Sequence, residues 1–394
     1  MLLNEKKSIA VLFGGRSAEH EISIITALQA ISAMDTLKYT IVPVYVSTQG
    51  KWYTGKELLH KAFYHNLTVN LPKVTEVTLL PDPTIGGLLL KQKDGSFNSK
   101  KIPIDVYFLA FHGQQGEDGA IQGLLELADA THTGSGLLAS AIAMNKYFCK
   151  KILENHAIPV LPGVLIKKTE AQQSLPDVIK KICHTQGLEN FPLFVKPCNL
   201  GSSIGISIAH DIPSLQASLA KAFKYDREAI VEPCIPQLRE INVSVMDGNP
   251  PQISVLEIPV SSGKVLTYED KYLRGGKKNA SSSGMAGLSR IINPPDLDPQ
   301  IKTELCEYAL KSYQLLNCSG ICRFDFIHDL NHNKLYFNEL NPLPGSFSYY
   351  LWEKNSPPVL YTELIDQMIR TAEERNAQKL GLETNFGFKA LQKV

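Results

Sequence analysis

The segment Ile321-Cys-Arg-Phe-Asp-Phe-Ile327 is followed by a polar turn and then by Lys334-Leu-Tyr-Phe-Asn-Glu-Leu-Asn-Pro342. This pattern predicts two short strands joined by a turn. Side chains alternate between the two faces of a strand, so we expect Arg323 and Asp325 on one face and the intervening phenylalanines on the other. One face of the hairpin is therefore polar, and the other belongs to a core.

The polar face carries a candidate cation site. On the second strand we expect Phe337, Glu339 and Asn341 to share one face. Strand pairing would then bring Asp325, Glu339 and Asn341 together, and Arg323 would lie beside them. Two carboxylates and an amide oxygen suit Mg²⁺, which binds a few carboxylates together with the phosphate oxygens of a substrate. The alternative interpretation is an exposed hairpin with charged side chains.

The length of 394 residues allows two or three domains, and a composition of 44% hydrophobic and 20% charged residues is typical of a globular protein. A net charge of +1 gives no electrostatic reason to expect nucleic acid or a membrane surface as partner. We find no apolar run that could span a bilayer and no signal peptide, so we expect a cytoplasmic location. The seven cysteines lack metal-ligand spacing, which predicts reduced thiols.

The N-terminal part has the pattern of a βαβ unit. Residues 8–13 form an apolar run, Gly14-Gly15 stops it, Ser17 is a candidate helix N-cap, and residues 40–46 form the next apolar run. This order favours a parallel sheet. The glycine turn lacks the GxGxxG pattern, so a packing turn is the alternative to a phosphate-binding turn. Residues 51–100 are interpreted as a connecting region with a peripheral hairpin.

A second glycine-rich turn follows the apolar strand at residues 106–111, where His112 begins the stretch HGQQGEDG. Ligands of open α/β sheets bind beyond the carboxyl ends of the strands, so His112 is a candidate site residue, with a structural histidine as the alternative. Residues 133–136, TGSG, are interpreted as a hinge. One helix is expected from about Leu137 to His156, and it carries Lys146.

A further candidate site lies after the strand at residues 191–196, which ends in Lys196. The loop PCNLGSSIG that follows has small residues and the hydroxyls of Ser202 and Ser203, which would let backbone N–H groups approach a polyanion. It is not a P-loop, and a plain hairpin is the alternative. Glu232-Pro-Cys-Ile-Pro236 is interpreted as a linker that could line a nucleotide cleft.

The C-terminal part adds a basic Gly/Ser-rich segment, 268–284, which is too polar for a core and is interpreted as a lid. Helices are expected at about 299–316 and 358–372, and the sequence from residue 373 onward is polar.

These stretches resemble the ATP-grasp superfamily and, within it, the D-alanine-D-alanine ligase family, over residues 8–372. The resemblance rests on motifs in the order found in the family: LFGGRSAEHEIS (12–23), FHGQQGEDGAIQGLLEL (111–127), TGSGLLASAIAMNK (133–146), VKPCNLGSSIGIS (195–207), YEDKYL (268–273), RFDF (323–326) and NELNPLPGS (338–346).

The resemblance implies an α/β (α+β multi-domain) ATP-grasp fold with an N-terminal Rossmann-like domain. The expected parts are an N-terminal substrate domain (1–134), a central α+β ATP-grasp subdomain (135–231), a C-terminal ATP-grasp and metal-binding catalytic domain (232–375), and a polar tail (376–394).

The resemblance also implies a role for each matched residue. The implied catalytic residues are Glu19, Ser202, Tyr272, Arg323 and Gly345; the substrate-binding residues are His112, Lys271, Ser346 and Ser348; the ATP-binding residues are Lys146, Lys196, Ser203, Glu232 and Glu240; and the ligands of two Mg²⁺ ions, or of Mn²⁺ in their place, are Asp325, Glu339 and Asn341.

The implied activity is ATP-dependent joining of two D-alanines through an acyl phosphate, for peptidoglycan precursor synthesis, by a cytoplasmic homodimer that uses neither nucleic acid nor a membrane. The alternative is another ATP-grasp ligase with different amino-acid specificity. The chain departs from the family at Tyr350, where many members have the serine that binds the second substrate's carboxylate. We expect Ser346 or Ser348 to supply that donor, while packing of Tyr349, Tyr350 and Trp352 against the N-terminal domain is the alternative.

Overall fold

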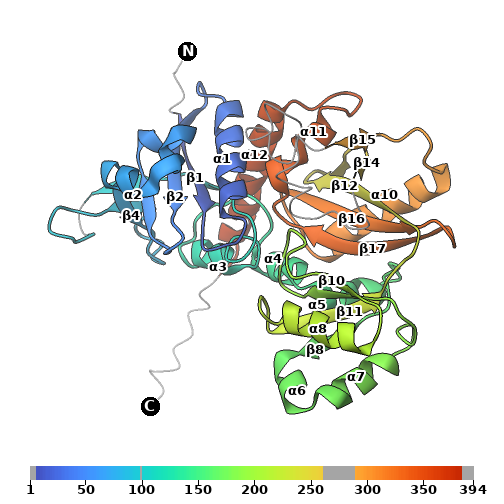
Figure 1. Cartoon of the computed structure of the whole chain (residues 1–394). Helices are drawn as coiled ribbons and strands as arrows, with labels where there is room; N and C mark the ends of the chain where they lie inside the picture. Colours follow the sequence, from blue (N-terminus) through green and yellow to red (C-terminus); the bar gives the residue numbers. More distant parts are fainter. Residues whose placement is uncertain (1–5, 98–99, 261–288, 384–394) are drawn as a thin grey trace, which may run out of the picture.

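The computed structural model describes residues 6–97, 100–260 and 289–383, and it contains three β-sheets (Figure 1). The lid segment, with Lys271 and Tyr272, lies outside these residues, as does the end of the predicted tail. Within the described residues, no helix is long and apolar enough to cross a membrane. All seven cysteines are free thiols.

The first sheet has the strand order β6-β5-β4-β3-β2-β1-β7. Strand β1 pairs in parallel with β2 and β7, which confirms the βαβ start, and the remaining pairs are antiparallel. The elements are β1 (Lys7–Gly14), α1 (His20–Ala33), β2 (Tyr39–Val46), β3 (Trp52–Thr54), η1 (Lys56–Leu59), η2 (Lys61–Asn66), α2 (Leu67–Asn70), η3 (Leu71–Lys73), β4 (Thr75–Thr78), β5 (Gly87–Leu90), β6 (Lys101–Pro103), β7 (Val106–Leu109) and α3 (Ala120–Leu127).

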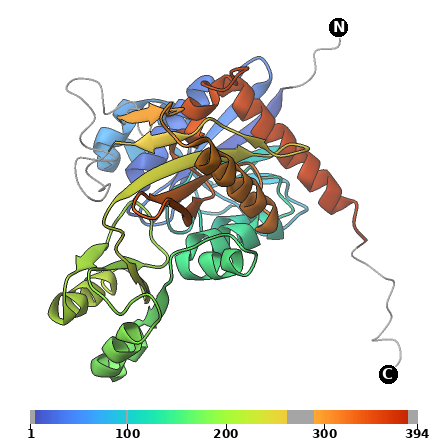
Figure 2. The same ribbon diagram turned by 90° about the vertical axis from the view of Figure 1, so that its right-hand side faces the viewer.

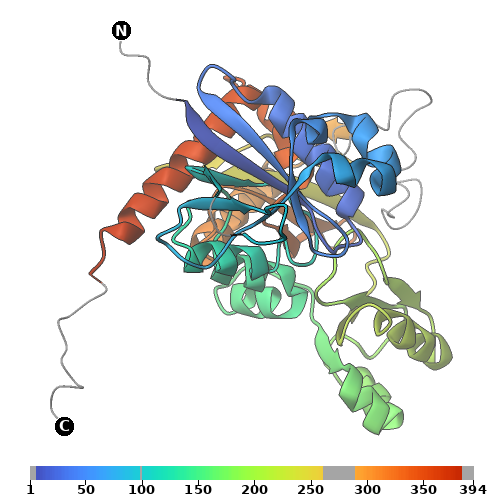
Figure 3. The same ribbon diagram turned by 90° about the vertical axis from the view of Figure 1, so that its left-hand side faces the viewer.

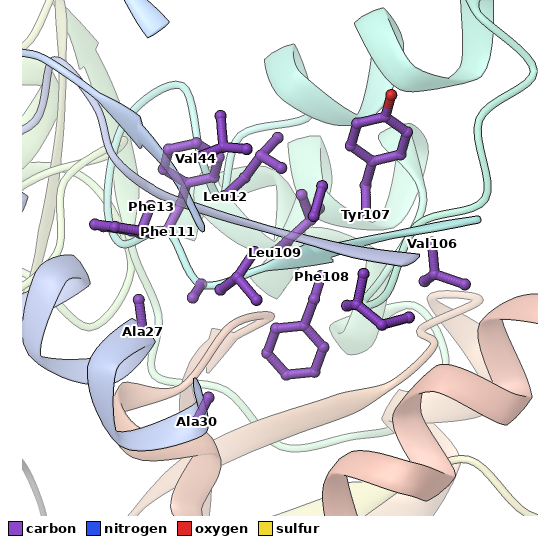
Figure 4. Packing of buried hydrophobic residues seen from close by; sticks show 14 of the residues in the cluster. Leu12, Phe13, Ala27, Ala30, Val44, Val106, Tyr107, Phe108, Leu109 and Phe111 are labelled. Atoms are coloured by element: carbon purple, nitrogen blue, oxygen red, sulfur yellow. The ribbon is translucent and has the colours of Figure 1, made fainter. Parts of the chain in front are cut away.

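Residues 51–100 are more regular than a connecting region with one hairpin. They supply β3, β4 and β5, which extend the first sheet, because Val77 and Leu88 become buried in its core. On β7, Phe108 points toward α1, while Tyr107 points to the opposite side of the sheet (Figure 4). The sheet therefore has a buried layer on each face.

The helix expected over 137–156 is two helices, α4 (Leu137–Met144) and α5 (Lys146–Glu154). Asn145 breaks the helix because its backbone is extended, and its side chain accepts a hydrogen bond from the N–H of Phe148 at 3.1 Å. Both helices pack against the third sheet, since Ala143, Cys149 and Leu153 belong to its core. Lys146 consequently begins a helix instead of lying within one.

The second sheet has the order β10-β9-β11-β8, and all its pairs are antiparallel. It forms a separate body with its helices (Figures 1 and 2). Its first strand in the sequence, β8, begins at Val164, and Glu232 lies in β11 rather than in the linker. The elements are β8 (Val164–Lys167), α6 (Lys168–Gln173), α7 (Leu175–Cys183), β9 (Leu193–Pro197), β10 (Ser207–Ala209), α8 (Ile212–Ala222) and β11 (Glu228–Pro233).

The third sheet has the order β15-β14-β12-β16-β17, and β13 pairs with β12. The hairpin predicted from residues 321–342 is present as the antiparallel pair β16–β17. The elements are β12 (Leu238–Met246), β13 (Gln252–Ile253), β14 (Glu257–Pro259), β15 (Arg290–Ile292), α10 (Pro299–Leu315), β16 (Ile321–Asp329), β17 (Lys334–Asn341), η6 (Gly345–Ser348), α11 (Tyr349–Trp352) and α12 (Tyr361–Leu380).

The hairpin contains a β-bulge that simple alternation did not predict. Asp325 pairs with Glu339 and Phe326 with Phe337, so Asn338 is an extra residue on β17. Phe337 therefore lies in the core, whereas Asn338 and Glu339 both line a cavity. The prediction that Phe337 shares a face with Glu339 is wrong for this reason.

The last helix, α12, lies beside the first sheet, far from it in sequence (Figure 3). Its buried face, which includes Leu364 and Met368, joins the core of β1 and β7. The helix continues beyond the predicted end at residue 372 to Leu380, because Arg375 still makes contacts there. The Arg375 guanidinium donates hydrogen bonds to the carbonyl oxygens of His132 and Gly134, each at 2.6 Å.

Candidate active site

A cavity of about 740 Å³ lies between the second and third sheets. One part of its wall is apolar and includes Phe194, Ile208 and Leu238, together with the linker from Cys234 to Gln237 between β11 and β12. The other part carries charged side chains. An apolar slot beside charged groups matches a ligand with a flat ring system and a polyanionic tail.

Lys146 enters this cavity from the first turn of α5. Its ammonium group donates to the carbonyl oxygen of Leu200 at 2.7 Å and lies 3.3 Å from Glu339 Oε2. Its backbone N–H donates to the carbonyl oxygen of Cys198 at 3.1 Å. Lys146 therefore connects α5 to the loop after β9, residues 197–205, which we call the Gly/Ser loop, and to the β16–β17 hairpin.

Glu232 is held between two lysines. Its side chain is 1% exposed, Lys150 Nζ contacts Oε1, and Lys196 Nζ lies 2.8 Å from Oε2. Lys196 also donates to Asn338 Oδ1 at 3.0 Å. Burial by itself would raise the pKa of Glu232, but the two ammonium groups outweigh it and lower that pKa to about 2. Glu232 is consequently ionised at neutral pH.

The three predicted cation ligands lie together. Arg323 donates to both carboxylate oxygens of Asp325, at 2.7 Å each, and the Asn341 amide donates to Asp325 Oδ2 at 3.2 Å. Asp325, Glu339 and Arg323 line the cavity. Within the described residues there is no cluster of three or more His, Cys, Asp or Glu side chains suited to a metal.

The Gly/Ser loop reaches the first sheet. The hydroxyl of Ser202 donates to Glu19 Oε1, and a Cβ atom at Gly201 would lie 2.9 Å from Glu19 Oε2, so a larger residue there would displace the Glu19 carboxylate. Ser202 and Ser203 both adopt positive φ angles, 52° and 58°. Glu19 itself is the N-cap of α1, in place of the expected Ser17, and places its carboxylate where the two parts meet.

His112 lies at the end of β7, as predicted, in a buried polar cluster. Its Nε2 is 2.8 Å from Thr26 Oγ1, and its Nδ1 is 3.7 Å from Glu117 Oε1. Burial raises the pKa of Glu117, against the opposing effect of His112, and the charge of Glu19 raises it further. These groups lie near the carboxyl end of the sheet, where a ligand of an open α/β fold binds.

The turn after the hairpin contacts α1. Ser346 donates from its hydroxyl to Gln29 Oε1 at 2.8 Å, and Ser348 is fully buried, with no hydrogen-bond partner for its hydroxyl among the described residues. Both serines and the intervening Phe347 have φ angles near 50°, a conformation that positions the backbone after Gly345. Neither serine is among the described residues that line the cavity.

Tyr350 contributes to the cavity wall indirectly. Its hydroxyl donates to Glu257 Oε1 at 3.2 Å, and the guanidinium of Arg290 lies 3.8 Å above its ring and donates to Glu257 Oε2 at 2.6 Å. Glu257 and Arg290 line the cavity near Arg323. Tyr349 instead stacks on Tyr361, and Trp352 packs into the core of the first sheet, as the packing alternative expected.

The structure thus brings most of the predicted residues to one region, and it adds some that sequence reasoning missed. Lys196, Ser203, Glu232 and Glu240 line the cavity with Lys146. The missed residues are Lys150, Asn338, Glu257 and Arg290. No local sequence pattern distinguishes them, since Lys-Lys pairs like the one at Lys150 recur elsewhere in the chain.

Comparisons with known proteins agree along most of the chain. Residues 8–135 match the family model described as D-ala D-ala ligase N-terminus, and residues 152–370 match D-ala D-ala ligase C-terminus. The D-alanine--D-alanine ligase of Chloroherpeton thalassium is 34% identical over 95% of this chain and 98% of its own length. That of Thermoanaerobacter sp. is 36% identical, with coverage of 95% and 99%.

Solved structures give the same result. The D-alanine-D-alanine ligase from Coxiella burnetii has a TM-score of 0.76 and 26% identity, over 95% of this chain and 96% of its own. The D-Ala:D-Ser ligase from Enterococcus faecalis has a TM-score of 0.73 and 26% identity, over 93% and 100%. The predicted ATP-grasp fold class is confirmed. With matches that cover both halves of the sequence and nearly the full length of its relatives, the chain belongs to the D-alanine-D-alanine ligase family.

Proposed function

We propose that this protein uses ATP to join two D-alanines into D-alanyl-D-alanine, as a step of peptidoglycan precursor synthesis. The observation that carries the proposal is the cavity in which Lys146, Lys196 and Glu339 converge, together with the Glu19–Ser202 contact at its edge. A ligase needs cations for a nucleotide polyanion and carboxylates for a metal in one place, and this cavity has both.

The nucleotide has a defined set of partners in this proposal. Lys146, Lys196 and Ser203 bind the phosphates, the linker backbone with Glu232 meets the adenine edge, and Glu240 binds the ribose. The apolar slot supports the base position, because a flat ring gains from burial between apolar side chains.

Asp325, Glu339 and Asn341 would hold two Mg²⁺ ions, or Mn²⁺ in their place. The donor set fits: it is all oxygen, with charges now balanced by Arg323 and Lys146. When bound, the metal ions supply charge neutralisation at the phosphate oxygens. Their number rests on the family resemblance.

The proposed chemistry has two steps. The carboxylate of the first D-alanine attacks the γ-phosphate to give an acyl phosphate and ADP, with His112 near that carboxylate and Glu19 orienting the amino group. The amine of the second D-alanine then attacks the acyl carbon and loses a proton, the C–O bond to the phosphate breaks, and inorganic phosphate leaves with the electron pair of that bond. Arg323 and the backbone at Gly345 stabilise the tetrahedral oxyanion. Lys271 and Tyr272, outside the described residues, complete the lid in this proposal.

The second-substrate pocket is the point where the chain departs from its relatives. Ser348 supports our assignment better than Ser346, because its hydroxyl is buried without a partner among the described residues, whereas Ser346 already donates to Gln29. Loss of a needed donor raises the KM for the second D-alanine about tenfold, which corresponds to ~1.4 kcal/mol. Ser346→Ala and Ser348→Ala, made singly, test this; if neither changes that KM, the carboxylate donor lies elsewhere.

A second candidate function is ligation with a different second substrate. The Tyr350–Glu257–Arg290 wall favours it, because this wall replaces a small serine with a larger, charged surface. A similar solved structure is named a D-Ala:D-Ser ligase, so second-site specificity varies among similar folds. We further propose a cytoplasmic homodimer with the domain limits given above.

The test is phosphate release with ATP, Mg²⁺ and a panel of D- and L-amino acids. We expect release that needs D-alanine. Silence with D-alanine together with activity on another pair would select the second candidate. Glu339→Gln should abolish turnover, because it removes a charge at the metal position; normal activity in that variant would mean that the metal lies elsewhere.

A further inference from the structure

Two adjacent lysines on α5 have opposite environments. The side chain of Lys151 is 42% exposed and pairs with Glu154 on the same helix at 2.8 Å. The side chain of Lys150 is 4% exposed and pairs with Glu232, which is 82 positions away in sequence. A buried lysine is costly unless it is paired, and the Glu232 carboxylate is the partner of Lys150.

Lys150 does not line the cavity among the described residues, but both of its neighbours in the cluster do. Glu232 and Lys196 are in the cavity wall. Lys196 is further fixed by Asn338 at 3.0 Å and lies 5.0 Å from the centre of the Phe194 ring. Lys150 therefore lies behind the cavity wall, and the wall residue that it contacts directly is Glu232.

The presence of Lys150 changes the net charge of the cluster around Glu232. Glu232 with Lys196 alone is neutral, and a buried carboxylate with one cation would draw that ammonium fully onto itself. Glu232 with Lys150 and Lys196 carries one net positive charge. That charge lies at the cavity surface, on Lys196, where an anionic ligand can use it.

We propose that Lys150 is a positioning residue for nucleotide binding: by holding Glu232 from behind the cavity wall, it keeps the Lys196 ammonium available to a phosphate group. This rests on the proposed function in one respect, that the cavity binds ATP. The pKa values agree with the geometry, since burial lowers the pKa of Lys150 to about 8 while Glu232 opposes that shift, so Lys150 is mostly charged at neutral pH.

The experiment compares ADP binding by calorimetry, without amino acids, in the wild type, Lys150→Met and Lys151→Met. The substitution by Met removes the charge and keeps most of the volume. We expect Lys150→Met to weaken ADP binding and to raise the KM for ATP by about tenfold or more, with a smaller change in the KM for D-alanine. Lys151→Met, the matched control, should behave as the wild type.

Two further variants separate positioning from stability. Lys150→Gln keeps a donor toward Glu232 without the charge, and it carries the test if the Met variant does not fold. In the double variant Lys150→Met with Glu232→Gln, both buried charges are gone and Lys196 is released, while the Gln amide oxygen still offers an acceptor to the adenine edge, so ADP should bind more tightly than to Lys150→Met alone.

Two results would overturn the inference: wild-type ADP affinity in a folded Lys150 variant, or equal losses in the single and double variants. The proposed function fails separately, because D-alanine-dependent phosphate release is measured on the wild type alone. A protein that binds ADP in a Lys150-dependent way and yet ignores D-alanine would keep the inference and remove the substrate assignment.

Discussion

The first and third sheets meet through an apolar contact, whereas the second sheet meets both of them through polar contacts. Met246, Leu343 and Trp352 of the C-terminal part lie in the same hydrophobic cluster as β1 and β7. The cluster of the second sheet draws its described members only from residues 164–231. Its links to the rest include the Glu19–Ser202, Lys150–Glu232 and Lys196–Asn338 contacts.

The difference suggests separate roles: the apolar contact stabilises the fold, and the polar contacts shape the cavity. Apolar contact is non-directional and proportional to area, so it joins two parts into one unit. Hydrogen bonds and ion pairs depend on geometry, and they line the cavity between the second and third sheets. The second sheet can therefore shift against the rest without opening an apolar core, and any such shift changes the cavity.

The largest effects on the free energy of unfolding are expected from substitutions in the hydrophobic cores. Leu364 and Leu219 are buried at 0% and 1% exposure, so each change to Ala should cost about 3 kcal/mol. Leu364→Ala should speed hydrogen exchange in both the first and third sheets. Leu219→Ala should speed it in the second sheet only.

Leu380→Ala is the control for the first of these variants, because Leu380 lies on the same helix and is 62% exposed. It should leave exchange rates unchanged. If Leu219→Ala raised exchange in all three sheets equally, the second sheet would be part of the shared unit and the comparison would fail.

The next effect is a pH dependence at the apolar contact. His132 is buried beside Arg375, and burial first, then the charge of Arg375, lowers its pKa to about 4. Between about pH 6.5 and 4 the unfolded chain binds a proton that the folded protein does not, so stability falls as the pH falls through this window. The difference approaches about 3 kcal/mol.

Replacement of the histidine isolates this contribution. Thermal or denaturant unfolding of His132→Gln should depend less on pH between 6.5 and 4 than unfolding of the wild type. Parallel pH curves for the two proteins would show that the His132 environment contributes nothing to acid sensitivity.

A smaller effect is expected at the polar contact. Ser202→Ala removes the hydrogen bond to the charged Glu19, and kcat/KM should fall about 10- to 100-fold while the melting temperature stays nearly constant. Ser207→Ala is the control, because the Ser207 hydroxyl has no partner among the described residues. A loss of stability with unchanged kcat/KM would reverse the roles that we assign to the two contacts.

The smallest effect is expected at the surface. Lys7 pairs with Glu373 of α12 at 2.6 Å, with side-chain exposures of 49% and 33%. Such exposed pairs contribute less than about 1 kcal/mol, so Lys7→Ala should change the free energy of unfolding by no more than that. A larger change would mean that charge pairs help to hold α12 on the first sheet.

The sequence predicted the parts of the site that depend on local pattern. Arg323, Asp325 and Glu339 were placed together because alternation along β16 and β17 puts polar residues on one face. His112 was placed at a strand end by the order of strand and glycine turn. Each of these inferences needs only neighbours in sequence or one strand pairing.

The other features of the fold and the site depend on three-dimensional packing, so they could not be predicted from the sequence. The bulge at Asn338 reverses the alternation for one residue, and no local signal distinguishes it from a regular strand. Lys150 and Lys151 are identical residues in sequence, and only the distant Glu232 makes one of them part of the site. Residues 51–100 have short strands whose pairing partners fix them more than their own pattern does.

The position of α12 has a consequence for how the protein is made. A ribosome completes β1 and β7 long before it reaches Leu364 and Met368, which finish the core of those strands. Until the last helix emerges, the nascent N-terminal sheet keeps an uncovered apolar face, and such a face is a target for chaperones or for aggregation. A chain that stops before α12 would leave the ribosome with that face still exposed.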